Sequence, residues 1–348
     1  MAFGWPTPRK VVIVPGSAHF GIGVGGGGGI TRLPSVMAYS PIRLARGQEG
    51  PVSGPLAPDR LRVLSLGEEA LVPAKPGEKQ KYLAWAVEGG EPRDPYVVEL
   101  VLRALLKKQG VGRLGRMLGS SHCRWVLPPT LSEKGHHLYR NLALTLGFRV
   151  VERVDLLLAA AQGGGLDIAH TGGSVVLEIG ADRTLLGVFS LGERVTGRNI
   201  PFGGRTLDTA LRQYIRDRYR LQLDARSAEA VKLKLGSLHP GGKQNSLDLQ
   251  GRDQGTGIEK KIVLDDNDIR DVLVDACEPL ILALQEGFEE VAPELAGDIA
   301  DVGVLLTGAG AKLAGMPEFL TERTGLRFRL AEKPDHATIL GALQMETP

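Results

Sequence analysis

This sequence has no long apolar run, only two cysteines and almost no net charge. No apolar stretch approaches the roughly 18–20 residues needed to span a bilayer, and Met1–Lys10 lacks the apolar segment of a signal peptide. Cys123 and Cys277 lie far apart in the chain, which favours a reducing compartment over a disulfide framework. A net charge of +2 is near balance and gives no reason to expect a nucleic-acid partner. We therefore expect a cytoplasmic protein.

Two common site motifs are also absent. Gly25–Gly29 is a run of five glycines, but no Lys-Ser or Lys-Thr follows it, so the Walker arrangement is missing and a hairpin tip is expected there. His122-Cys123 and His136-His137 do not have the spacing of a common zinc site. These residues are interpreted as ordinary surface and core positions.

The most informative stretch runs from Ser174 to Gly204. An apolar strand, Val175–Ile179, carries Glu178 near its end, and a second strand, Leu185–Leu191, runs back. The polar residues between them begin with Gly180, which predicts a tight turn. Successive backbone N–H groups in such a turn make a natural anion site. A helix is expected over Arg205–Tyr219, directly after Gly203-Gly204, because its apolar residues recur at helical spacing.

Strands alternate with helices along the rest of the chain, which predicts an α/β protein. Asp94–Lys108 has apolar residues on one helical face. A long helix is expected from about Asp266 to Val291, although Pro279 lies inside it. With 348 residues, the chain is long enough for two domains, each with its own core.

Several motifs, in order, resemble those of the actin-like ATPase superfamily, and within it most closely the bacterial rod-shape-determining MreB family. The resemblance rests on the strand–Glu178-Ile179-Gly180–turn–strand unit with Gly203-Gly204 and Asp208, followed by Ser227–Ser237, Gln250–Asp253, Thr256-Gly257 and Leu306–Ala311. It implies two α/β domains around a nucleotide cleft. The implied division is residues 1–165 with a small subdomain at about 35–73, residues 166–330 with a small subdomain at about 205–260, and a segment 331–348 that returns to the first domain.

The first phosphate hairpin of the family departs most from its pattern here. The resemblance aligns Val14 with an aspartate that organises a magnesium-bound water, and Pro15 has no N–H for a phosphate. Gly16 and Ser17 retain the ability to bind one.

The second phosphate hairpin departs less than the first, although Ala181, Asp182 and Arg183 replace what is usually Gly-Gly-Thr. Glu178 occupies its aspartate position, where it either reaches a metal shell or is a solvated acid at the end of a strand. Gly180, Arg183 and Thr184 are the expected phosphate contacts of the turn, and Asp182 opposes a phosphate. Gly203, Gly204 and Asp208 match the Gly-Gly-x-x-x-Asp that follows, with Arg205 in place of an acid.

Hydrolysis in the superfamily needs a Glu or Gln that orients the attacking water just before an Ala-rich helix. The resemblance places Leu156 at this position, and leucine cannot polarise water. Asp155 is a possible substitute only if the helix is shifted. No catalytic residue is therefore assigned, with Asp155 and Glu178 as possible substitutes.

On the adenosine side, Glu229 and Lys232 match the family's Glu-x-x-Lys pair, although an i,i+3 surface ion pair is an equally simple explanation. Gly308, Ala309 and Gly310 match the turn near adenosine and phosphate.

A possible membrane contact lies between Leu100 and Ser132, where the sequence has no acid but several bases. Leu114, Met117 and Leu118 sit among these bases, and Phe3 and Trp5 provide a second possible anchor. A solvated basic loop is the alternative.

Together these residues imply a cytoskeletal filament or scaffold involved in cell shape, with a partly degenerate site for ATP or ADP and Mg²⁺ and at most weak ATPase activity. The expected partners are further copies of the chain, an anionic membrane surface at the inner face of the membrane, and cell-wall synthesis or shape proteins. An ordinary ATP-dependent filament protein and a small-molecule kinase of the same superfamily are the alternatives.

Overall fold

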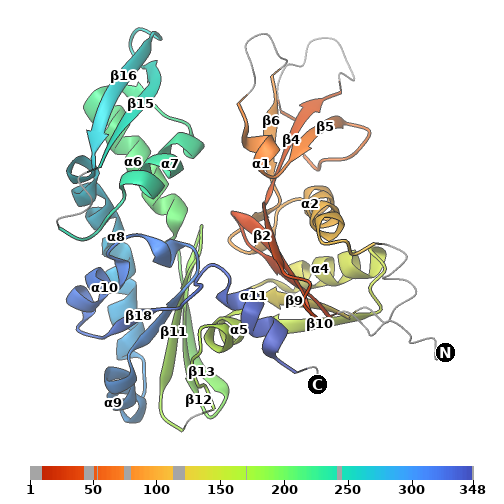
Figure 1. The fold of residues 1–348 in the computed structure, drawn as a ribbon, viewed down its shortest axis with the longest axis vertical. Coiled ribbons are helices and arrows are strands. Elements are labelled where there is room, and N and C mark those ends of the chain that lie inside the picture. Colours follow the sequence, from red (N-terminus) through yellow and green to blue (C-terminus); the bar gives the residue numbers. More distant parts are fainter. Residues whose placement is uncertain are drawn as a thin grey trace. The chain divides into compact units, whose positions relative to one another are not determined.

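The computed structural model describes residues 10–42, 51–52, 54–73, 80–112, 122–169, 171–240 and 245–346. Its contacts divide the chain into two compact units. Unit 1 comprises residues 1–159 and 338–348, and unit 2 comprises residues 160–337. Each unit contains a five-stranded and a three-stranded sheet with helices (Figure 1). This architecture confirms the predicted mixed α/β fold.

The large sheet of unit 1 has the strand order β10-β9-β1-β2-β3. Its strands β1, β2 and β3 form antiparallel hairpins, whereas β9 and β10 add in parallel. The predicted hairpin tip at Gly25–Gly29 lies between β2 and β3. The bounds are β1 (Lys10–Pro15), β2 (His19–Val24), β3 (Ile30–Pro34), β9 (His122–Leu127) and β10 (Val150–Asp155).

The smaller sheet of unit 1 has the order β5-β4-β6, and β7 and β8 form a short separate hairpin. The helix α2 packs against strands of both sheets, and Trp125 stacks on Tyr139 of α4 with ring centroids 4.8 Å apart. The bounds are β4 (Val36–Pro41), β5 (Leu61–Leu66), α1 (Glu68–Leu71), β6 (Tyr82–Trp85), β7 (Val87–Glu88), β8 (Glu91–Pro92), α2 (Pro95–Lys108) and α4 (Glu133–Thr145).

The large sheet of unit 2 has the order β13-β12-β11-β17-β18, and a separate three-stranded sheet has the order β14-β15-β16. Its central strands are apolar and almost entirely buried, as expected for strands covered on both faces. The bounds are β11 (Ser174–Ile179), β12 (Thr184–Ser190), β13 (Glu193–Ile200), β14 (Leu221–Gln222), β15 (Ser246–Asp253), β16 (Glu259–Asp265), β17 (Val304–Thr307) and β18 (Phe328–Leu330).

The helices of unit 2 pack on these sheets through one apolar core. The longest, α8, starts with Asp265 as its N-cap and continues through Pro279. The bounds are α6 (Gly204–Tyr219), α7 (Ala225–Leu235), α8 (Asp266–Glu289), α9 (Pro293–Val302), the short η1 (Gly310–Lys312) and α10 (Met316–Thr324). The helix α5 (Leu156–Gly163) contains the chain crossing from unit 1 to unit 2.

The last helix, α11 (Ala337–Gln344), returns the chain to unit 1 and packs on β2. Two glycines make this approach possible, because a Cβ at Gly21 would lie 2.4 Å from Ile339 and one at Gly23 would lie 2.6 Å from the same side chain. A Cβ at either position would force the Ile339 side chain to shift, so glycine at both positions favours the close approach of α11.

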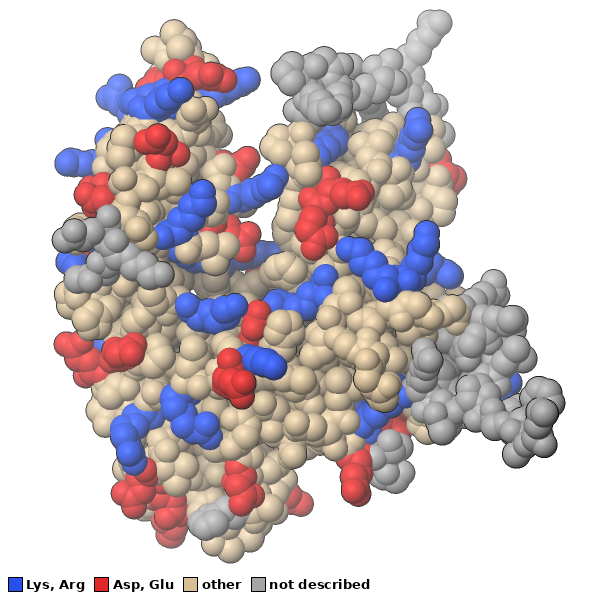
Figure 2. Space-filling view, viewed as in Figure 1, with Lys and Arg blue, Asp and Glu red and all other residues tan. Residues whose placement is uncertain are grey.

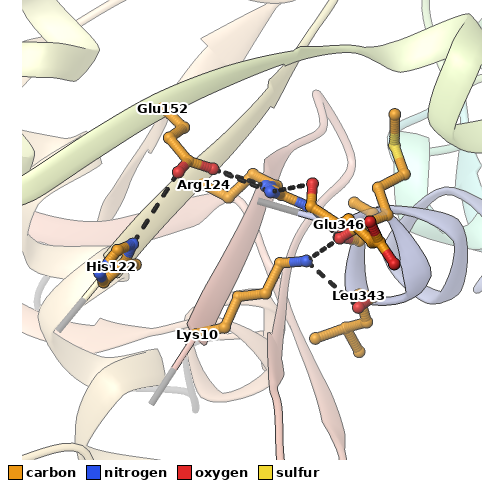
Figure 3. A network of polar contacts seen from close by, with 8 residues as sticks. Lys10, His122, Arg124, Glu152, Leu343 and Glu346 are labelled. Atoms are coloured by element: carbon orange, nitrogen blue, oxygen red, sulfur yellow. Dashed lines mark hydrogen bonds and ion pairs between the residues drawn. The ribbon is translucent and has the colours of Figure 1, made fainter. Parts of the chain in front are cut away.

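Two cations hold the end of α11 on the sheet (Figure 3). The buried Arg124 guanidinium donates to the carbonyls of Ala342, Met345 and Glu346 and pairs with the Glu152 carboxylate at 2.9 Å. The Lys10 ammonium donates to the Leu343 and Met345 carbonyls. Burial and the Arg124 charge lower the pKa of Lys10, while Glu152 opposes this shift. Cations at the C-terminal end of a helix are favourable because the last carbonyls carry the negative end of its dipole.

Candidate functional site

The turn between β11 and β12 is closed by its own backbone and held by the start of α6. The Gly180 amide donates to the Arg183 carbonyl at 2.9 Å. The Gly204 and Arg205 amides, the first of α6, donate to the Gly180 and Ala181 carbonyls at 3.0 and 2.8 Å. A Cβ at Gly203 would lie 2.5 Å from the Ala181 carbonyl oxygen, so this approach requires glycine. The first amides of α6 therefore hold the turn in place.

Thr184 has a structural contact that the sequence did not reveal. Its side chain is fully buried, and its hydroxyl donates to the Phe202 carbonyl at 2.9 Å. This bond joins the start of β12 to the loop that leads into α6.

Glu178 lies at the carboxyl end of β11, where it is the register partner of Thr307 on the parallel strand β17. Its side chain is half-buried, and burial raises the pKa of Glu178 to about 7, against the opposing influence of the Arg183 charge. Thr307 is fully buried, and its hydroxyl has no hydrogen-bond partner in the part of the chain that the structure describes. The two side chains place a titrating carboxyl next to an unpaired hydroxyl.

The loop after β17 closes over the same turn. Gly308 has φ of +84°, and a Cβ there would lie 2.3 Å from the Ile179 carbonyl oxygen and 2.8 Å from a Glu178 carboxylate oxygen. A Cβ at Gly310 would lie 3.2 Å from the Gly180 carbonyl oxygen. Ala309 precedes η1. The structure thus brings together the predicted residues of the second hairpin and those of the adenosine-side turn.

Lys232 and Asp208 form a largely buried ion pair that joins α7 to α6. The Lys232 ammonium lies 2.7 Å from the Asp208 carboxylate, and the two side chains are only 11% and 12% exposed. The same ammonium donates to the Gly204 carbonyl at 3.0 Å. Burial raises the pKa of Asp208, and the charge of Lys232 opposes this shift. Glu229, the other member of the predicted pair, is exposed.

A second ion pair lies at the tip of the turn. The Arg205 guanidinium is 2.7 Å from the Asp182 carboxylate, with the two side chains 35% and 14% exposed. The sequence showed an acid in the turn and a base after the two glycines, but it could not show that they pair.

The first hairpin belongs to unit 1 and presents different chemistry. Val14 is the register partner of Gly21 near the end of β1, and the Gly16 amide donates back to the Val14 carbonyl at 3.1 Å. The Ser35 hydroxyl donates to the Gly16 carbonyl at 2.6 Å. Ser17 is 9% exposed. The turn offers no acid at the position of Val14.

The start of α5 is also occupied by structural contacts. One Asp155 carboxylate oxygen accepts from the Leu157 and Leu158 amides at 2.8 and 3.3 Å, which makes Asp155 the N-cap of α5. Leu156 is 8% exposed. A capping carboxylate is oriented by the helix and not by a substrate water.

The resemblance implies a magnesium ion. Whether it fits depends on the carboxylates that the turn offers as ligands. Unit 2 offers Glu178 at the end of β11 and Asp182, paired with Arg205, in the turn, and the described residues contain no group of three potential metal ligands. Magnesium keeps several waters and is usually held by one or two carboxylates plus substrate phosphates. These residues therefore fit a magnesium ion only as part of a nucleotide complex.

The predicted membrane residues Phe3, Trp5, Leu114, Met117 and Leu118 lie outside the described residues. Among the described residues, no helix is long and apolar enough to cross a bilayer.

Comparisons with known proteins agree with this geometry. The chain is 27% identical over 335 residues to the cell shape-determining protein Mbl of Bacillus subtilis (strain 168), covering 96% of this chain and 94% of the relative. It is 30% identical over 248 residues to the cell shape-determining protein MreB of Escherichia coli (strain K12), covering 71% of each.

Solved structures share the fold over nearly the whole chain. MreB5 of Spiroplasma citri bound to ADP superposes with a TM-score of 0.84 at 24% identity, covering 97% of this chain and 95% of that one. The MamK double helical filament superposes with a TM-score of 0.74 at 17% identity, covering 97% and 100%. These likenesses confirm the predicted actin-like fold. The sequence profile of the family described as MreB/Mbl protein matches residues 81–347, and the chain belongs to this family.

Proposed function

We propose that this protein is a filament-forming, cell-shape-related member of its family that binds adenine nucleotide and hydrolyses it slowly or not at all. The observation that carries this proposal is the start of α5, where Leu156 is buried and the neighbouring Asp155 carboxylate caps the helix. A water-orienting group must accept a hydrogen bond from the attacking water. Leu156 has no acceptor, and one Asp155 carboxylate oxygen already accepts from the amides at the start of α5.

Nucleotide binding is supported by the second hairpin. Glu178, Gly180, Gly308 and Gly310 are packed within one small region of unit 2, and Lys232 is fixed beside Gly204. In the solved neighbours, MreB5 of Spiroplasma citri is bound to ADP in one structure and to AMPPNP in another. We infer the same ligand class, ATP or ADP with Mg²⁺, for this chain.

Self-association is supported by the fold. The MamK neighbour forms a double helical filament, and a heterologous contact that repeats by translation produces open filaments. Since the acids that handle water are not needed for such contacts, we expect assembly without hydrolysis.

The family membership supports a proposal for the location of the protein in the cell and for its partners. We place the protein in the cytoplasm at the inner face of the membrane, with cell-wall synthesis or shape proteins as partners. Membrane binding would use Phe3, Trp5, Leu114, Met117 and Leu118 beside the basic residues around them, because apolar tips ringed by cations bind anionic lipid. Pelleting with anionic liposomes before and after Leu114→Ser with Leu118→Ser tests this part. Unchanged pelleting at high salt would contradict it.

The main test measures binding, turnover and assembly on one preparation. We expect bound adenine nucleotide in the purified protein or saturable ADP binding, phosphate release near background, and filaments by electron microscopy with and without ATP. Phosphate release at the rate of an active family member would instead favour the ordinary ATP-dependent filament protein. A protein that stays monomeric at high concentration with lipid and ATP would contradict the filament proposal. The family assignment does not favour a small-molecule kinase.

A further inference from the structure

The cations around the β11–β12 turn are already matched by carboxylates of this chain. Arg205 pairs with Asp182 at 2.7 Å, and Lys232 pairs with Asp208 at the same distance. The charge of Glu178 interacts favourably with that of Arg183. Arg205 and Lys232 are therefore each paired with an acid of this region. On the face drawn in Figure 2, unit 2 likewise shows acidic and basic side chains next to each other and no large patch of one sign.

The pairs converge on the first turn of α6. The Gly204 carbonyl accepts from Lys232, and its amide donates to the Gly180 carbonyl in the turn. The next residue, Arg205, pairs with Asp182 at the tip. Both amides at this helix end are bonded to carbonyls of the turn, so the positive end of the helix dipole is directed at the turn itself.

We propose that Asp182 sets the ligand preference of this site, so that affinity rises little from adenosine through AMP and ADP to ATP. This inference depends on the proposed nucleotide binding. A phosphate near the turn meets cations whose charge is already balanced, Arg205 by Asp182 and Lys232 by Asp208. Because the Asp182 charge offsets the attraction of Arg205 for an anion, each added phosphate gains little.

The carboxylate of Asp182 is well placed for this role. Its side chain is 14% exposed, so solvent screens it less than a fully exposed acid. Its partner Arg205 fixes it at the tip of the turn, where it does not swing away from an approaching anion. Asp182 thus supplies an anion from the chain itself, in a turn whose backbone is arranged to bind the phosphate of a ligand.

Isothermal titration with adenosine, AMP, ADP and ATP in EDTA tests the preference, since EDTA removes cations that would offset phosphate charge. We expect nearly equal affinities for the four ligands in the parent protein. Asp182→Asn should increase the ratio of ATP to adenosine affinity by about fivefold or more, which is the effect of roughly 1 kcal/mol. Arg205→Gln should lower the same ratio.

Asp217→Asn is the matched control, because it removes a carboxylate from an exposed pair on α6 with Arg216. Twelve residues along a helix from Arg205 correspond to about 18 Å, beyond the Debye length of about 8 Å at physiological salt, so this variant should leave the ratio unchanged. Combining Asp182→Asn with Arg205→Gln should return the ratio toward that of the parent. Thermal unfolding of each variant checks that it is folded.

The outcomes separate this inference from the function on which it depends. If adenine ligands bind but the ATP-to-adenosine ratio is unaffected by both Asp182→Asn and Arg205→Gln, the inference is wrong and nucleotide binding stands. If none of the four ligands binds the parent or any variant, both are wrong. A parent that already prefers ATP by a hundredfold would also overturn the inference.

Discussion

The turn between β1 and β2 and the turn between β11 and β12 occupy corresponding places in their two units, and they depart from the family pattern differently. The first lacks groups that the resemblance leads us to expect, since Val14 stands where an acid is expected and Pro15 has no N–H. The second retains charged groups, but each is paired within the chain, as Asp182 with Arg205 shows. A site can therefore weaken either by deletion of its functional groups or by their internal neutralisation, and the two changes respond to different substitutions.

The largest expected effect is a loss of folding free energy when the buried ion pair beside the second turn is broken. Lys232→Met leaves the Asp208 carboxylate buried without its partner, and removing one member of a buried pair typically costs about 3–5 kcal/mol of folding free energy. Lys234→Met, an exposed lysine on the same helix α7, is the control and should cost less than about 0.5 kcal/mol. Urea unfolding of both variants measures the difference. Equal midpoints would show that the buried pair contributes little.

A smaller effect is expected from restoring the first turn and the start of α5. Val14→Asp with Leu156→Glu introduces both acids that the resemblance requires, and general-base catalysis typically contributes about 10²–10⁴-fold. Because the surrounding groups are not arranged for them, we expect an increase in phosphate release of only about tenfold. Val14→Asn with Leu156→Gln is the matched control, because these side chains have nearly the same shape as Asp and Glu but carry no acid. No difference between the two double variants would show that more than the acids has been lost.

The smallest effect concerns the pH dependence of stability through Glu178. Its folded pKa is about 7 and its ordinary value is 4.5. Because the folded state holds the proton more tightly, the protonated carboxyl favours folding at low pH, and this contribution is lost as pH rises from about 4.5 through 7. With partial solvent screening we expect a loss of about 1–2 kcal/mol.

Glu178→Gln should remove this decline, whereas Glu229→Gln on the exposed face of α7 should retain it. The free energy of unfolding of both variants, measured from pH 5 to 8, tests this difference. A Glu178→Gln protein with the parent's slope would exclude Glu178 as its source.

Local patterns predicted the α/β class and the hairpin followed by a helix, whereas the actin-like fold and the identity of the second hairpin came from the resemblance to the family. The turn at Gly180, the helix after Gly203-Gly204 and the glycines after β17 each follow from residues within a few positions of one another. Even the long helix through Pro279 was expected at nearly its observed bounds.

The contacts that decide the chemistry were not predictable in this way, because they join residues far apart in the chain. Thr184 retains its hydroxyl, yet that hydroxyl donates to Phe202, eighteen positions away. Lys232 was expected beside Glu229, yet its partner is Asp208 on another helix. Asp155 was a possible substitute for a water-orienting acid, and only the geometry shows it capping α5.

The return of the chain through α11 has a consequence for synthesis on the ribosome. Unit 2 is one continuous segment, whereas unit 1 needs residues from 338 onward, which Arg124 and Lys10 hold against its sheet. The N-terminal unit is therefore completed last. At about 5–20 residues per second, the segment 160–337 takes roughly 10–35 s to translate, and during this time the glycine-lined face of β2 has no α11 to cover it.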